Sequence, residues 1–283
     1  MRKRLDSEQL KKIEFRLLRD FDAYCQKNGL TYWLAYGTLI GAIRHEGFIP
    51  WDDDIDVMMP RKDYDRLCEM AGENEIGAHT RLLSHKTDRR YYLPQGKIID
   101  TSTVVKEHVT VDYEIGVNID IFPVENLADD FDEALNRIRK AYRYNQALQI
   151  KIVRWRKERA FVRNLELMAA KLVFLGRSVP SILNRLDSFC CERKNRDTMK
   201  YIGVMAGIVG ADEKRVYEAE WFRETRMVPF EGQLFPVPGN AEELLTRVYG
   251  DYMKLPPESE RVTHHDFEAW QTENKEDEGE TDK

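Results

Sequence analysis

Four aspartates stand within five residues where a loop gives way to an apolar run. The stretch reads PWDDDIDVMMP, and the acids are Asp52, Asp53, Asp54 and Asp56. Like charges at this spacing repel one another, and burying an unpaired carboxylate costs several kcal/mol. The cluster must therefore lie in a solvated turn or be neutralised by a cation, and hard divalent cations are the usual partners of carboxylate oxygens.

The residues after the cluster alternate in polarity, which is typical of a strand. In DIDVMMP the side chains of Asp54 and Asp56 share one face, and Ile55 and Val57 share the other. A later segment, NIDIF, alternates in the same way around Asp120. If the two strands are neighbours, three carboxylates converge. Such a site can hold one or two Mg²⁺ ions, or Mn²⁺ in their place, which clamp a phosphate and stabilise charge during in-line displacement.

A second feature precedes the acids. LTYWLAYG predicts a buried strand that ends in a turn at Gly37 and Thr38, and residues 39–44 are expected to form a short helix. Backbone N–H groups at such a turn and helix N-terminus can cradle a phosphate. Together with Asp120, this arrangement favours phosphate-and-metal chemistry over a solvated strand.

A calcium loop is the main rival for the acidic cluster, because acids at relative positions 1, 3 and 5 open an EF-hand loop. That loop also needs Gly at position 6 and Glu at position 12. Val57 and Asp63 occupy those positions here. The EF-hand interpretation fails.

The chain as a whole has the composition of a globular protein, with 283 residues, of which 42% are apolar, and a net charge of −6. This charge gives no reason to expect a nucleic-acid partner. The cysteines form no C-x-x-C pair, so neither a zinc site nor a disulfide framework is expected. Without an apolar signal segment or a long uncharged apolar run, the expected location is the cytoplasm, with the inner face of the membrane as a further option.

Four regions are expected along the chain. Residues 1–130 form the catalytic core, residues 131–200 a basic helical region, residues 201–270 complete the core and the active site, and residues 271–283 form a disordered acidic tail. Within the first region, Ser7 is expected to cap a helix that runs to about Lys27 and stops at Gly29.

Three blocks resemble one known family. AYGTLIGAIRHEGFIPWDDDIDVMMPRKDYDRL, NIDIFPVENL and PFEGQLFPVPGNAEELLTRVYGDYMKLPPESERVTHH are similar to blocks of the LicD family of phosphocholine transferases, which is related to the fukutin group. The similarity covers roughly residues 30–127 and 229–265. The wider nucleotidyltransferase-like pattern, Gly-[Gly/Ser] followed by [Asp/Glu]-x-[Asp/Glu] and a third acid, is met by Gly37-Thr38, by Asp54 and Asp56, and by Asp120. Thr38 departs from Gly/Ser but keeps a hydroxyl.

The resemblance implies an α+β fold, with a nucleotidyltransferase-like mixed sheet, flanking helices and a helical subdomain. It also implies transfer of phosphocholine from CDP-choline to a hydroxyl of a cell-surface glycan precursor, of teichoic acid or lipopolysaccharide type, with release of CMP. Ribitol or glycerol phosphate from the matching CDP donor, a true nucleotidyltransferase and a non-catalytic metal-binding module are the alternatives.

Site residues follow from the matched blocks. Asp54, Asp56 and Asp120 are the expected catalytic and metal-binding carboxylates, with Asp120 favoured as a ligand over a base. Asp52 and Asp53 are candidates for orienting the ligands. The other expected contacts of the substrate are Gly37, Thr38, Arg44, His45, Trp51, Lys97, His264 and His265. For Arg44 a surface ion pair, and for Lys97 a solvated strand lysine, are the competing interpretations.

The segment from Arg137 to Arg163 is strongly basic, with ten Lys and Arg residues against Glu158 alone. Aromatic residues are interleaved with these charges. A solvated helix face is one explanation. The other is a surface for a polyanionic acceptor, such as a lipid-linked glycan, or for an anionic membrane.

Overall fold

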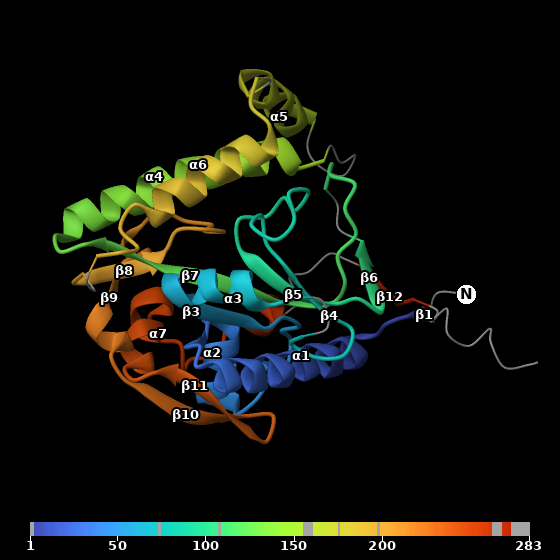
Figure 1. The fold of residues 1–283 in the computed structure, drawn as a ribbon, viewed down its shortest axis with the longest axis vertical. Helices are drawn as coiled ribbons and strands as arrows, with labels where there is room; N and C mark the ends of the chain where they lie inside the picture. The colour runs from blue at the N-terminus through green and yellow to red at the C-terminus, as the bar shows by residue number, and fades with distance from the viewer. Residues whose placement is uncertain are drawn as a thin grey trace, which may run out of the picture.

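A mixed sheet lies at the centre of the fold, with helices packed around it (Figure 1). The computed structural model describes residues 3–72, 75–106, 109–154, 161–174, 176–196, 199–261 and 268–272. Within these residues the larger sheet has seven strands, of which β3 and β7 are parallel neighbours while the other pairs are antiparallel. The strands are β2 Trp33–Leu34, β3 Asp56–Pro60, β4 Thr80–Leu83, β5 Gly96–Asp100, β7 Asn118–Ala128, β8 Tyr201–Val204 and β9 Tyr217–Glu218. The expected α+β class is confirmed.

Smaller sheets and the helices complete the molecule. The described helices are α1 Ser7–Asn28, α2 Tyr36–His45, α3 Arg61–Met70, α4 Phe131–Ile152, α5 Phe161–Val173, α6 Val179–Cys191 and α7 Ala241–Tyr249, with 3-10 turns η1 Glu213–Arg215, η2 Ala219–Phe222 and η3 Glu258–Glu260. The remaining strands are β1 Lys3–Arg4, β6 Thr103–Lys106 and β12 Glu268–Gln271 in one sheet, and β10 Thr225–Phe230 and β11 Gln233–Pro238 in a hairpin.

The N-cap of α1 lies one residue earlier than expected. Asp6, not Ser7, is the N-cap: its carboxylate accepts from the Gln9 backbone N–H at 2.8 Å, and the Gln9 side chain accepts from the Asp6 N–H at 3.1 Å. This reciprocal pair is a capping box, which satisfies two helix-end donors where a lone serine would satisfy one. The expected stop is confirmed, since Gly29 ends the helix in the left-handed conformation with φ 59°.

The segment LTYWLAYG is shorter as a strand than expected. Only Trp33 and Leu34 pair with β3, and α2 already begins at Tyr36, so Thr38 lies in the first helical turn and not in a turn before it. Tyr36 has φ 47°, a left-handed conformation that few non-glycine residues adopt. This residue ends the extended run and lets the helix start at once.

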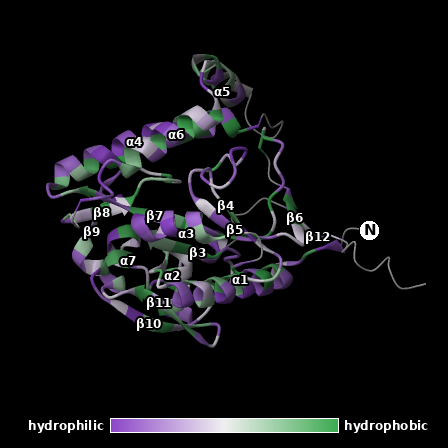
Figure 2. Cartoon of the chain, in the orientation of Figure 1, coloured by the Kyte–Doolittle hydropathy of each residue, from purple (hydrophilic) through white to green (hydrophobic). Residues whose placement is uncertain are grey.

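Three helices, α4, α5 and α6, lie within residues 131–200, which were expected to be helical. Helices α4 and α6 lie side by side above the sheet in Figure 1, and Figure 2 shows hydrophilic and hydrophobic residues interleaved along them. Their apolar faces join the same core as α1, α2 and the sheet. Among the described residues, no helix is long and apolar enough to cross a bilayer. The four-region division stays a prediction, and residues 273–283 lie outside the described residues.

A buried ion-pair network ties three elements together. Arg61, the first residue of α3, is 5% exposed, and its Nε donates to Glu125 Oε1 on β7 at 2.7 Å. Its Nη1 donates to Asp187 Oδ1 on α6 at 3.2 Å. Removing one partner of such a pair leaves a buried charge, whereas replacing both partners with apolar groups is often tolerated.

We therefore expect Arg61→Met to lower the free energy of unfolding by about 3–5 kcal/mol. The double variant Arg61→Met/Glu125→Leu should recover most of that loss, because it leaves no uncompensated carboxylate on β7. Urea denaturation at neutral pH measures the free energy of unfolding of both variants. A double variant less stable than Arg61→Met would contradict this account of the network.

Candidate active site

Two of the three expected carboxylates lie directly opposite each other. Asp56 opens β3 and is paired in register with Asp120 on the parallel strand β7. The Asp120 N–H donates to the Ile55 carbonyl at 2.9 Å, which fixes this register. Asp54 lies two residues before Asp56, on the approach to the strand. Since neighbouring strands lie about 4.8 Å apart, the two paired carboxylates can reach one ligand.

Thr38 contacts this pair from α2. Its hydroxyl oxygen accepts a hydrogen bond from the Asp56 backbone N–H at 2.9 Å. The hydroxyl therefore anchors the start of β3, and its own hydrogen remains able to donate to a phosphate oxygen.

Lys97 brings positive charge to the carboxylates. It stands opposite Asp120 on β5, and its ammonium group forms an ion pair with Asp120 Oδ1 and donates to Asn118 Oδ1 at 2.7 Å. The amide of Gln95 donates to the other oxygen, Asp120 Oδ2, at 3.3 Å. Lys97 was expected to contact phosphate, and in this structure it holds Asp120.

The cluster carries more negative charge than Lys97 offsets. Burial raises the pKa of Asp56 well above its ordinary value, and the charges of Asp54 and Asp120 raise it further, while Lys97 lowers it. Among the described residues no three acidic, histidine or cysteine side chains already stand as a metal cage. The donors are nonetheless carboxylate oxygens, which suit a hard divalent cation. The carboxylate donors are therefore compatible with Mg²⁺, and binding of this ion stays a prediction.

Glu14 is a further carboxylate that faces the same cluster and that sequence reasoning missed. It lies on α1 and is 3% exposed, and its Oε2 has no hydrogen-bond partner among the described residues. Burial and the charge of Asp54, followed by other members of the cluster, raise its pKa well above the ordinary value. The available signal was its place between Leu10 and Leu18 on the buried face of α1.

Gly37 in the first turn of α2 leaves no room for a side chain. A Cβ on Gly37 would come within 2.4 Å of Asp52 Oδ2, so the carboxylate of Asp52 lies directly against this residue. A helix N-terminus attracts negative charge, because its first N–H groups lack intrahelical partners. Asp53, the next residue, is also buried.

Arg44, His45 and Trp51 form a separate group. Arg44 and His45 occupy the last turn of α2, about 13 Å along the axis from its first residue at 1.5 Å per residue. Arg44 donates to the Tyr252 carbonyl, and the His45 and Trp51 rings lie 6.4 Å apart. The Arg261 guanidinium lies over Trp51 at 5.5 Å. Arg44 and His45 therefore lie at the opposite end of α2 from its N-terminus, whereas Trp51 directly precedes Asp52; the substrate contacts of all three residues stay predictions.

The remaining expected contacts, His264 and His265, lie outside the described residues, as do residues 155–160 of the basic segment. Two tyrosines, Tyr36 and Tyr249, lie near Asp56. Burial raises the pKa of Tyr249, and the charge of Asp56 raises it further. Tyr36 packs edge-on against Phe122 at 5.2 Å. Arg215 lies 5.9 Å from the Tyr36 ring.

Glu14 yields a prediction about stability and pH. Because its folded-state pKa lies above the unfolded value, the folded protein binds more protons between those two values, and stability falls as pH rises through that window. Glu14→Gln removes this group while keeping its shape. Without added metal, the variant should gain stability relative to the native chain at pH 8 and show no such gain at pH 4. Urea denaturation at both pH values checks this, and a gain confined to pH 4 would contradict it.

Comparison with known proteins adds an independent line of support. Residues 29–142 match the model of the LicD/FKTN/FKRP nucleotidyltransferase domain. The chain is 29% identical over 279 residues to the lipopolysaccharide cholinephosphotransferase LicD of Haemophilus influenzae, covering 95% of this chain and 99% of that protein. It is 32% identical over 112 residues to an uncharacterised protein of Rickettsia prowazekii, covering 36% of this chain and 41% of that one. Because the expected motifs, the family-domain match over residues 29–142 and an end-to-end relative agree, the resemblance to LicD proteins is confirmed and the chain is a transferase.

Proposed function

We propose that this protein transfers phosphocholine from CDP-choline to a hydroxyl of a lipopolysaccharide-type glycan and releases CMP. The observation that carries the proposal is the in-register pair Asp56 and Asp120, held by Lys97, in a chain similar from end to end to a lipopolysaccharide cholinephosphotransferase. That relative also favours lipopolysaccharide over teichoic acid as the acceptor class.

The reaction forms one P–O bond and breaks another. The acceptor hydroxyl oxygen attacks the phosphorus that carries choline, the phosphoanhydride bond to CMP breaks, and the hydroxyl proton leaves to base or solvent. Asp54, Asp56 and Asp120 are the residues that would hold Mg²⁺. Bound magnesium offsets the diphosphate charge and the charge that develops on the leaving group.

The protein's own groups orient the donor around this centre. The first N–H groups of α2 have no side-chain cap at Ala35, and they would offer donors for a phosphate. Lys97 and Gln95 fix both oxygens of Asp120, so that this carboxylate keeps one orientation. Fixed dipoles and charges of this kind stabilise a transition state without reorganising during the reaction.

Choline is a quaternary ammonium ion, and aromatic faces bind such ions through cation–π attraction. Trp51 is among the substrate contacts expected from the sequence, but the Arg261 guanidinium already lies over its ring. Tyr249 as a whole residue is 43% exposed, while burial of its hydroxyl, followed by the charge of Asp56, raises the pKa of that hydroxyl. Tyr249 is therefore the better-placed aromatic contact for the donor's choline group.

The test is CMP release from CDP-choline, CDP-ribitol and CDP-glycerol, with Mg²⁺ and a lipopolysaccharide-type acceptor. CDP-choline should be the preferred donor. Asp54→Asn and Asp56→Asn should each lower kcat by about a hundredfold or more, because each removes a carboxylate from the metal site. Asp132→Asn, an exposed change at the start of α4, is the matched control and should keep full activity.

Other outcomes separate the alternatives. Preference for another CDP-alcohol would keep the reaction type and change the substrate. Release of pyrophosphate from a nucleoside triphosphate would identify a true nucleotidyltransferase. Full turnover by both Asp→Asn variants would contradict the assignment of the carboxylates, and no turnover with any donor would favour the non-catalytic module.

A further inference from the structure

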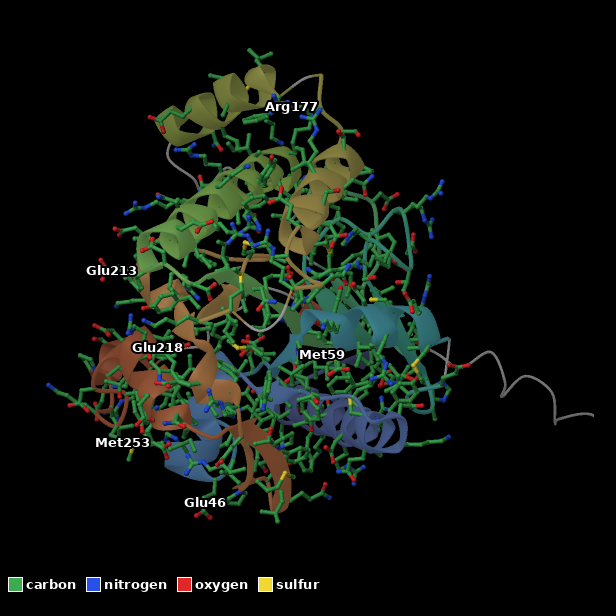
Figure 3. All side chains as sticks on the ribbon, turned by 60° about the vertical axis from the view of Figure 1, so that its left-hand side comes forward. Glu46, Met59, Arg177, Glu213, Glu218 and Met253 are labelled. Atoms are coloured by element: carbon green, nitrogen blue, oxygen red, sulfur yellow. The ribbon has the colours of Figure 1, made fainter. Side chains whose placement is uncertain are left out.

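A cavity lies at the end of β3 and β7 that is opposite to the carboxylates Asp56 and Asp120. It has a volume of about 700 Å³ and is bounded by Pro60 at the end of β3, by residues 124–126 of β7 and by the segment around Glu218. Figure 3 labels Met59, which precedes Pro60 on β3, and Glu218 on β9. The size of the cavity is that of a small-molecule site.

This cavity is separate from the carboxylate centre. Asp56 and Asp120 form the first residue pair of the parallel β3–β7 pairing, and Pro60 and Val124 form its last pair. Four residues of strand separate the two ends, which is about 13 Å at 3.3 Å per residue. A small ligand in the cavity therefore does not reach the acids.

Cations dominate the lining although the chain is acidic overall. The basic residues are Arg61, Lys62, Lys194, Arg196, Lys200 and Arg223. The acids are Glu125, Glu218 and Glu220. Arg61 is bound by Glu125, and Lys194 by Asp65 at 3.0 Å. Three of the exposed cations have no acidic partner among the described residues, namely Lys62, Arg196 and Arg223.

Part of the rim, the backbone at Arg196, Met199 and Lys200, is anchored by hydrogen bonds. The Asn126 side chain donates to the carbonyls of Arg193 and Arg196 at 3.3 and 3.4 Å, and it accepts from the Met199 N–H at 3.3 Å. The Lys200 N–H donates to Asp129 Oδ1 at 2.8 Å. A rim held by β7 in this way costs little to order when a ligand binds.

The lining of the cavity also contains carboxylates and aromatic rings, which could bind parts of a ligand other than its anionic group. Glu218 and Glu220 bring carboxylate acceptors for hydroxyl groups, and Trp33 and Phe222 pack edge-to-face at 5.1 Å as an apolar side. Phosphate for the cations, hydroxyls for the carboxylates and C–H groups for the aromatic side occur together in a sugar phosphate. We propose that this cavity binds a phosphorylated saccharide.

Such a ligand has two sources, the phosphorylated part of the glycan acceptor or a free sugar phosphate. Only the first source rests on the proposed function. Because the cavity lies about 13 Å along the strands from Asp56 and Asp120, it could bind a part of the acceptor that is distant from the hydroxyl receiving the phosphocholine.

The test is calorimetry on the full chain at low salt, with glucose 6-phosphate and glucose as probes. Glucose 6-phosphate should bind, and glucose should bind at least about tenfold more weakly because the cations lose their partner. Lys62→Ala/Arg223→Ala should weaken glucose 6-phosphate binding about tenfold or more. Lys27→Ala/Arg185→Ala removes the same two charges from exposed positions outside the cavity and should bind like the native chain.

Equal binding of glucose 6-phosphate by the native chain and the cavity variant would overturn the proposal, as would an equal loss in the control variant. A kinetic arm identifies the source. A raised KM for a phosphorylated lipopolysaccharide core oligosaccharide, with an unchanged KM for CDP-choline, points to the acceptor. Lost sugar-phosphate binding with an unchanged acceptor KM points to a free sugar phosphate. The calorimetric result stands even if no CMP is released, so failure of the proposed function stays distinguishable.

Discussion

The parallel pairing of β3 with β7 is the constraint on which the rest of the structure depends. It sets Asp56 opposite Asp120 at one end and Pro60 opposite Val124 at the other. The first end gathers carboxylates and the second opens into a basic cavity. A register shift of one residue would turn the acids toward the apolar face and move both sites at once.

Charge balance around this pairing explains why the acids are tolerated. Lys97 is placed on Asp120 by the antiparallel register of β5, and Gln95 holds the second oxygen. Glu14 and Asp56 both have pKa values raised by burial and by their acidic neighbours, so the cluster still has an excess of negative charge. A divalent cation in this site would relieve that excess, which is the electrostatic basis of the proposed Mg²⁺ dependence.

The sequence predicted what short-range periodicity determines. Alternation correctly placed Asp56 and Asp120 on strands, whereas Asp54 lies before β3 begins, and the stop of α1 at Gly29 followed from its conformational freedom. Contacts between distant segments carry no such signal. The ion pair of Lys97 with Asp120, the approach of Glu14 to the cluster and the cavity beyond Pro60 all depend on tertiary packing. The cap at Asp6 was missed because two adjacent residues can both cap a helix, and only the Gln9 contact decides between them.

The most direct test of this account is Mn²⁺ binding, measured by electron paramagnetic resonance titration in the presence of CDP-choline. Mn²⁺ is a spectroscopic substitute for Mg²⁺ at carboxylate sites. We expect the native chain to bind the ion and Asp56→Asn and Asp120→Asn to weaken binding about tenfold or more each, since both carboxylates would ligate the same ion under this proposal. Unchanged binding in both variants would contradict the claim that the β3–β7 pairing builds a metal centre.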